Sequence, residues 1–296
     1  MKRLLISTAS LALIAGQANA ADLPSMKSAP VVAPAPKWTG FYAGLNAGGV
    51  WSANNSVYLT ASPLWGSSYY STAIDSVYSS SLAGSGANSS GYSGFIGGGQ
   101  IGYNWTINSK IVAGIETDMQ GTANSSNNSF TNRVAPTPHA NFWVYQGSVS
   151  SNLSYLGTLR GRVGYLPLEN LLIYATGGLA YGGVNLNTSI TQVGLQLNPA
   201  YNFTYPGYFT GNGSNATTQV GWTAGGGVEW LFMQNWSAKL EYNYYDLGSL
   251  NQDFLAARFT SDPPSPVYFL EKYNGSSHFN GNIARAGVNY HFNFAS

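Results

Sequence analysis

Cysteine is absent from this 296-residue chain, charged residues are scarce, and no long apolar run follows the first twenty residues. Without cysteine, no disulfide framework can hold the fold. Only 8% of the residues are charged, against about 25% in an ordinary soluble domain, so a soluble globule with a charged surface is excluded. The 12 basic residues barely outnumber the 11 acidic ones, which argues against a nucleic-acid-binding face. No later segment reaches the roughly 18 apolar residues of a transmembrane helix.

Glycine and aromatic residues take the place of charge. The chain has 36 Gly, 21 Tyr and 8 Trp, and 14% of its residues are aromatic. Its mean hydropathy of −0.08 is far too polar for a helical membrane protein. Few charges, many aromatics and neutral hydropathy together indicate a chain that meets lipid with alternate residues only, as a transmembrane β-barrel does.

The N-terminus has the three parts of a secretory signal peptide. A basic start at Lys2 and Arg3 precedes an apolar stretch over 4–16, and Ala18-Asn19-Ala20 matches a cleavage site. We therefore predict a signal peptide over 1–20 with cleavage after Ala20. Residues 21–37 contain four prolines, which favour an extended tail on the periplasmic side. The barrel is expected over 38–296.

Alternation with a period of two predicts eight strands. Each segment sets apolar or aromatic residues on one face against small or polar residues on the other, over about the 9–11 residues that a tilted strand needs to cross a bilayer. We expect an all-β, antiparallel, up-and-down transmembrane barrel. The segments 142–149 and 190–197 could extend neighbouring strands above the membrane, and a count of ten stays open if one of them enters the bilayer. The eight segments are 41–50, 95–105, 112–120, 155–165, 172–183, 220–230, 238–245 and 284–294.

The connections between these segments alternate in length. Short periplasmic turns and long external loops are typical of outer-membrane barrels, and aromatic residues gather near the short turns, as an interfacial girdle requires. We therefore expect a protein of the Gram-negative outer membrane, exposed at the cell surface. The short connections are 106–110, 166–170 and 233–235, and the long ones are 51–94, 121–153, 184–219 and 248–278.

Eight charges fall on the polar face of the predicted strands, four of each sign. An unpaired charge inside a narrow barrel would cost several kcal/mol, so this balance indicates a salt-bridged network that fills the interior. A turn centred on Gln234 places Glu229 opposite Lys239, both inside. The eight residues are Glu116, Asp118, Arg160, Arg162, Glu229, Lys239, Glu241 and Arg285.

Five stretches carry a resemblance to a known family: 38–49, 158–165, 173–181, 236–248 and 285–292. Together they resemble the alphaproteobacterial outer-membrane surface-antigen and haemin-binding branch of the OmpA/OmpX-type β-barrels, often called porin family proteins. The resemblance implies an integral outer-membrane protein that the barrel-assembly machinery inserts after recognising an aromatic-ended last strand. It also implies contact with outer-membrane lipid and lipopolysaccharide.

The function expected from this pattern is structural. We predict a non-enzymatic barrel that supports envelope integrity and presents its loops at the surface, with no cofactor, no metal site and no nucleic-acid partner. A surface ligand-binding or adhesion protein is one alternative, and in that case His139, beside several aromatic residues, is the candidate haem ligand. A small diffusion porin is another. The pair Ser277-His278 suggests a serine hydrolase, but no acidic residue is found at a recognisable spacing.

Overall fold

The computed structural model describes residues 38–66, 84–126, 128–134, 141–196, 208–260 and 267–292, and their regular structure consists of β-strands. The strands belong to one antiparallel sheet, and β1 pairs with both β4 and β11, which closes the sheet on itself. The strands are β1 (Gly40–Ser52), β2 (Ser56–Gly66), β3 (Gly86–Ser89), β4 (Ser93–Asn108), β5 (Ile111–Ser125), β6 (Asn128–Val134), β7 (Asn141–Leu168), β8 (Leu171–Gln196), β9 (Tyr208–Leu231), β10 (Trp236–Thr260) and β11 (Val267–Phe292).

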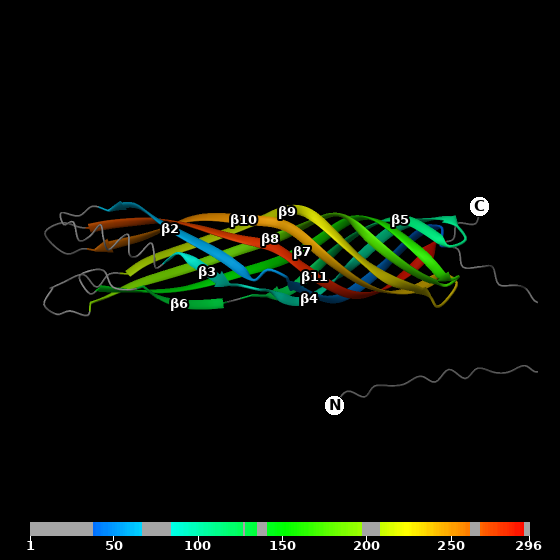
Figure 1. Ribbon diagram of the computed structural model, residues 1–296, viewed down its shortest axis with the longest axis horizontal. Helices are drawn as coiled ribbons and strands as arrows, with labels where there is room; N and C mark the ends of the chain where they lie inside the picture. Colours follow the sequence, from blue (N-terminus) through cyan, green and yellow to red (C-terminus); the bar gives the residue numbers. More distant parts are fainter. Residues whose placement is uncertain are drawn as a thin grey trace, which may run out of the picture. The chain divides into compact units, whose positions relative to one another are not determined.

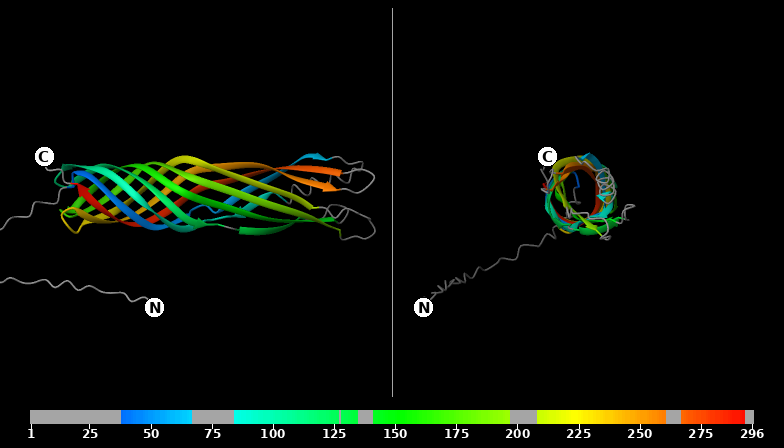
Figure 2. Two further views of the ribbon diagram at one scale, coloured as in Figure 1. Left: turned by 180° about the vertical axis from the view of Figure 1, so that it is seen from behind. Right: turned by 90° about the vertical axis from the view of Figure 1, so that its left-hand side faces the viewer.

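The closed circuit runs β1-β4-β5-β7-β8-β9-β10-β11 and back to β1, so it returns through the first and last strands (Figure 2). Three further strands are not part of this circuit but pair edge to edge with its strands or with one another. β2 pairs with the first part of β11, β3 pairs with β2, and β6 pairs with β7. The predicted class, an antiparallel transmembrane-type barrel, is confirmed. The eight strands of the circuit overlap the eight predicted segments, and the described sheet has eleven strands because segments expected as loops supply three more.

The short turns lie where the alternation placed them. Asn108 begins one of them, and its side-chain oxygen accepts hydrogen bonds from the backbone N–H groups of Lys110 at 2.9 Å and Ile111 at 2.8 Å, a local bond that stabilises a tight reversal. Another turn joins β9 to β10, and beyond it Glu229 pairs with Lys239 across the two strands. The register predicted for this hairpin is confirmed.

The long connections, expected as external loops, consist largely of strand within the described residues, and 142–149 and 190–196 extend β7 and β8, as the sequence allowed. β7 to β11 have 24–28 residues each, far more than the roughly 10 that cross a bilayer. At about 3.3 Å per residue, the 26 residues of β8 extend for about 85 Å. The barrel therefore continues well beyond the length that lipid requires, and β2, β3 and β6 lie along this continuation, which we call the extension (Figure 1).

The polarity of the outward residues of β8 explains why the alternation does not predict most of the extension as membrane strand. In the lower half, the outward residues include Ile173 and Leu179, which are exposed and apolar. In the upper half, the outward position Asn187 is exposed, whereas its inward neighbours Leu186 and Ile190 are buried. The period of two therefore continues unchanged while its polarity inverts. A strand outside the membrane faces water on its outer side, so polar residues belong there.

Several predictions lie outside the described residues. The signal peptide over 1–20, the tail over 21–37 and the chain end after Phe292 are among them. The candidate haem ligand His139 also lies outside the part of the chain that the structure describes.

Candidate functional site in the barrel interior

All eight charged residues predicted for the interior are buried, and each has at most 5% of its surface exposed. Glu116 and Asp118 come from β5, and the neighbouring strand β7 supplies Arg160 and Arg162, with Glu116 directly opposite Arg160 in the register. β9, β10 and β11 supply the other four from the far side of the circuit. Alternation alone brings them together, because residues two apart on a strand point to the same face.

Arg160 occupies the centre of this charged layer. Its guanidinium forms an ion pair with Glu116, lies 2.8 Å from Asp118 Oδ2, and lies 2.9 Å from Glu241 Oε1. Arg285 shares these partners, at 2.8 Å from Asp118, 2.5 Å from Glu241 and 4.0 Å from Glu116. Two arginines and three carboxylates from four strands thus form one cluster across the barrel. The planar donors of arginine suit this role because they bind several carboxylate oxygens at fixed angles.

The lower part of the layer is organised by Glu229. Arg162 Nη2 lies 2.6 Å from one oxygen of this carboxylate. The other oxygen accepts hydrogen bonds from Ser237 Oγ at 2.6 Å and Asn289 Nδ2 at 2.7 Å. Arg162 also lies over the ring of Tyr174, 4.1 Å from its centroid. Each side chain here is held by several partners, which is what a buried charge requires to be tolerated.

Apolar layers lie below and above the charges. The lower layer includes Trp38, whose indole N–H donates to the backbone oxygen of Glu169 at 2.9 Å close to the short turns. The upper layer is larger and draws side chains from most strands of the circuit. Its members are Val50, Val57, Leu59, Tyr92, Ile96, Val149, Leu153, Leu156, Ala180, Val184, Leu186, Tyr245, Leu247, Leu250, Phe279 and Ile283.

A second polar group lies in the extension. Tyr273 OH donates to Glu271 Oε2 at 2.9 Å and also contacts Gln192, and its ring stacks on Phe254 with centroids 5.1 Å apart. Burial, together with the neighbouring Glu271 carboxylate, raises the pKa of Tyr273 well above its usual value. Burial likewise raises the pKa of Tyr145. These hydroxyls stay protonated at physiological pH and act as fixed hydrogen-bond groups inside the extension.

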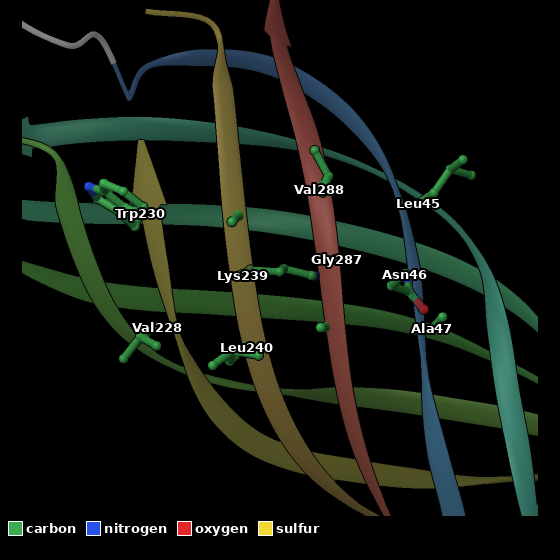
Figure 3. Close-up of a pocket in the computed structure, with 11 residues that line it drawn as sticks. Leu45, Asn46, Ala47, Val228, Trp230, Lys239, Leu240, Gly287 and Val288 are labelled. Carbon is green, nitrogen blue, oxygen red and sulfur yellow. The ribbon is translucent and has the colours of Figure 1, made fainter. Parts of the chain in front are cut away.

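The outer face of the lower barrel is apolar. A groove of 660 Å³ crosses β1, β9, β10 and β11, where Ala47, Ala238 and Ala286 leave space between larger neighbours such as Leu45 and Trp230 (Figure 3). Near the turns, aromatic rings pack edge to face, as Trp236 does on Tyr290 with centroids 5.2 Å apart. An exposed apolar belt with aromatic residues at its border matches the hydrocarbon core and the interface of a bilayer.

The structure separates the pair Ser277-His278. Adjacent residues of a strand point to opposite faces, so Ser277 is buried on the inner side, whereas the imidazole of His278 retains 36% of its exposure. His278 instead contacts Ser249 and Asp246 of β10. The acidic partner that spacing alone did not reveal is therefore present, on the neighbouring strand and 32 residues away in sequence. This acidic partner becomes apparent only from the register between β10 and β11.

Within the described ranges, no group of three or more His, Asp or Glu residues could hold a metal ion. Nor does the described part of the chain contain a helix long and apolar enough to cross a membrane.

The comparison with known families is decisive for identity. The family described as the outer membrane protein beta-barrel domain matches residues 8–292. The chain belongs to this family. It is therefore a protein of the outer membrane, as the belt and the aromatic border indicate.

Curated relatives of this outer membrane protein point the same way. The 31 kDa outer-membrane immunogenic proteins of Brucella melitensis biotype 1 and Brucella suis biovar 1 are each 32% identical over 243 residues, which cover 81% of this chain and 85% of theirs. The 22 kDa outer membrane protein of Rhizobium leguminosarum bv. viciae is 28% identical over 165 residues, covering 55% of this chain and 58% of its own.

Among solved structures, OprG of Pseudomonas aeruginosa is 10% identical with a TM-score of 0.35, covering 86% of this chain and 97% of its own. Ail of Yersinia pestis is 9% identical with a TM-score of 0.26, covering 82% and 99%.

Proposed function

We propose that this outer membrane protein is a filled barrel that strengthens the cell envelope and raises a surface extension above the lipid. The observation that carries the proposal is the layered interior. Ion pairs around Arg160 lie between an apolar layer that includes Trp38 and a larger apolar layer that includes Leu153 and Phe279. A circuit of eight strands encloses an interior so narrow that the barrel's own side chains can fill it.

The energetics of the charged layer support a structural role rather than a conducting one. An ion that crossed the barrel would have to separate pairs such as Arg285 and Glu241, which lie 2.5 Å apart, and then pass an apolar layer. Removing one partner of a buried pair typically costs about 3–5 kcal/mol, and charge in an apolar layer adds a desolvation penalty. The network is therefore better suited to hold the wall together than to pass solutes.

The extension supports a role in surface presentation. Its strands keep mostly polar residues outward, with Leu64 and Leu255 among the exposed exceptions, so it stands in water above the belt. Its interior is packed around Tyr273 and Phe254. The Brucella relatives are named immunogenic proteins, a name that fits proteins exposed at a cell surface. We extend that exposure to this chain. The lipid-facing belt is proposed to contact outer-membrane lipid and lipopolysaccharide, and the barrel-assembly machinery to insert the chain.

Planar-bilayer conductance tests the filled interior. The purified barrel, with its folded state checked by its heat-dependent electrophoretic mobility, should give no steady conductance steps. A large general porin reconstituted in the same way is the positive control. Steady steps of porin size would show an open path and would replace this proposal with that of a diffusion porin.

Envelope integrity is tested in cells that lack the protein. A deletion strain should become more permeable to hydrophobic dyes and more sensitive to detergent, and the wild-type gene should restore both. As a matched variant, Arg160→Ala should restore less than wild type, because it removes the centre of the buried network. Unchanged permeability in the deletion strain would remove the envelope role without affecting the conductance result.

A further inference from the structure

Three residues on the outer face of the barrel form a chain of hydrogen bonds. Ser249 Oγ lies 2.9 Å from His278 Nδ1, and His278 Nε2 lies 3.1 Å from each carboxylate oxygen of Asp246. Ser249 is directly opposite His278 in the pairing of β10 with β11. A serine, an imidazole and a carboxylate in this order are the parts of a nucleophile, its base and the group that orients the base.

The three residues meet because β10 contains a bulge at this point. The register between β10 and β11 shifts between Asp246 and Ser249, and Gly248 has a φ of +79°, which residues with a Cβ seldom adopt. The shift brings Asp246 and Ser249, three residues apart, to the same side of the strand. The backbone N–H of Gly248 donates to Asp246 Oδ1 at 2.8 Å, which fixes the carboxylate.

The hydrogen bonds also define which nitrogen carries the proton. An ionised carboxylate only accepts, so Nε2 must donate to Asp246. The neutral imidazole then has its lone pair on Nδ1, where it can accept the hydroxyl proton of Ser249. This assignment follows from the hydrogen-bond partners, and it gives His278 the role of a base directed at the serine.

The group lies at the border between the apolar belt and the polar outer surface. Asp246 pairs with Trp222 of β9, which is 52% exposed within the belt. Below Asp246 on the outer face of β10 lie Tyr242 and Leu240, and above it lie exposed polar positions such as Asp253. At this height a lipid presents the ester bonds that join its acyl chains to its headgroup, since aromatic borders mark the headgroup level.

We propose that Ser249, His278 and Asp246 form an esterase site that cleaves the acyl ester of a lipid in the outer leaflet. Ser249 Oγ attacks the ester carbonyl carbon as its proton passes to His278 Nδ1. The bond from that carbon to the alcohol oxygen breaks, and His278 returns the proton to the departing alcohol. Water, activated by His278, then attacks the acyl-serine, which releases the fatty acid and restores Ser249.

The proposed reaction needs hydrogen-bond donors for the oxyanion, and we place them in the irregular backbone of β10 beyond Ser249. The register between β9 and β10 shifts between Asp246 and Ala256, so this stretch of β10 departs from regular cross-strand pairing. In the same stretch Asn215 Nδ2 of β9 donates a hydrogen bond to the backbone oxygen of Asn251 at 2.8 Å. Backbone donors near a nucleophile are the usual components of an oxyanion hole. The proposed site is independent of the filled interior, and its confirmation would overturn the expectation of a non-enzymatic barrel.

A covalent probe tests the nucleophile. The folded full-length barrel in detergent micelles is treated with a nitrophenyl phosphate triester, which phosphorylates an activated serine and releases nitrophenolate. We expect one adduct, mapped by peptide mass to Ser249 and absent from Ser249→Ala. Ser276→Ala, which alters a nearby serine on β11, should label like wild type. Labelling that persists in Ser249→Ala, or no labelling of wild type, would overturn the proposal.

Hydrolysis assays test the substrate class. One arm of the assay offers a phospholipid in mixed micelles. The other arm offers a water-soluble short-chain nitrophenyl ester. We expect fatty-acid release from the lipid, and a fall of about 10²-fold or more in His278→Ala, the range of general base catalysis. Asp246→Asn should lower the rate and alter its pH profile, which a merely structural role would not do. Hydrolysis of the soluble ester alone would overturn the lipid assignment, and no hydrolysis in either arm would overturn the esterase itself.

Discussion

Glu229 and Lys239 face each other across the turn between β9 and β10, yet the shortest ion pair of each runs to another strand. Glu229 pairs with Arg162 of β7 at 2.6 Å, and Lys239 lies 3.1 Å from Glu116 of β5. Cross-strand neighbours therefore define the register, whereas the charges are satisfied across the interior. Exchanging the charges of Glu229 and Lys239 tests whether their partners across the interior, rather than each other, stabilise them.

Exchanging the two charges should not restore stability. In the double variant Glu229→Lys with Lys239→Glu, the new lysine would lie beside Arg162, and the new glutamate beside Glu116 and Glu241. Each single variant should cost about 3–5 kcal/mol, the usual effect of breaking a buried pair, and the double variant should be at least as unstable as either. Denaturant unfolding of the refolded barrel measures this. Recovery of wild-type stability would mean that the two residues are mainly each other's partners.

Arg160→Ala should destabilise the barrel more strongly than loss of an exposed pair. Arg160 contacts Glu116, Asp118 and Glu241, and all are buried. The matched control is Lys272→Ala, which removes a 2.9 Å pair with Asp253 whose side chains are 46% and 53% exposed. Exposed pairs contribute little. The same unfolding experiment compares them, and equal effects would argue against a central role for Arg160.

The barrel wall was largely predictable from the sequence because each transmembrane strand carries a strong period of two. That pattern fixed which face is apolar, and the turn centred near Gln234 fixed the register of Glu229 with Lys239. Sign balance on the polar face further indicated that the eight charges lie together. These inferences depend on local alternation and on adjacent strands, and both can be read from a sequence.

The sequence indicated only parts of the extension, at 142–149 and 190–197, and it did not indicate the group around His278. The reasons are physical. In the extension the outer face is polar, as at Asn187 of β8, so a search for lipid-facing residues passes over it. The contact of His278 with Asp246 requires the exact offset between β10 and β11, and a bulge at Gly248 changes that offset. Nothing in the local spacing of the chain reveals such a shift.

Stability should fall in alkaline solution through the buried tyrosines of the extension. Burial raises the pKa of Tyr273 and of Tyr145, so the folded state holds these protons more tightly than the unfolded state, in which a tyrosine titrates near 10. Their contribution is complete below that pH and is lost progressively above it. The free energy of unfolding should therefore decline above about pH 10, and the slope should be smaller in Tyr273→Phe. An identical slope in that variant would contradict the assignment.

The outer face is apolar in the belt and polar in the extension. An outward arginine should therefore destabilise the barrel in the belt but not in the extension. Leu240 is 62% exposed in the apolar belt, so Leu240→Arg should cost about 2–4 kcal/mol if it lies near the bilayer midplane. Asn187→Arg introduces the same charge on the outer face of the extension, where water receives it, and should leave stability close to wild type. Folding into lipid vesicles, followed by heat-dependent mobility and denaturant titration, measures both. If Asn187→Arg proved as harmful as Leu240→Arg, the extension would have to lie within the lipid, because only a low-dielectric surrounding makes an outward arginine so costly.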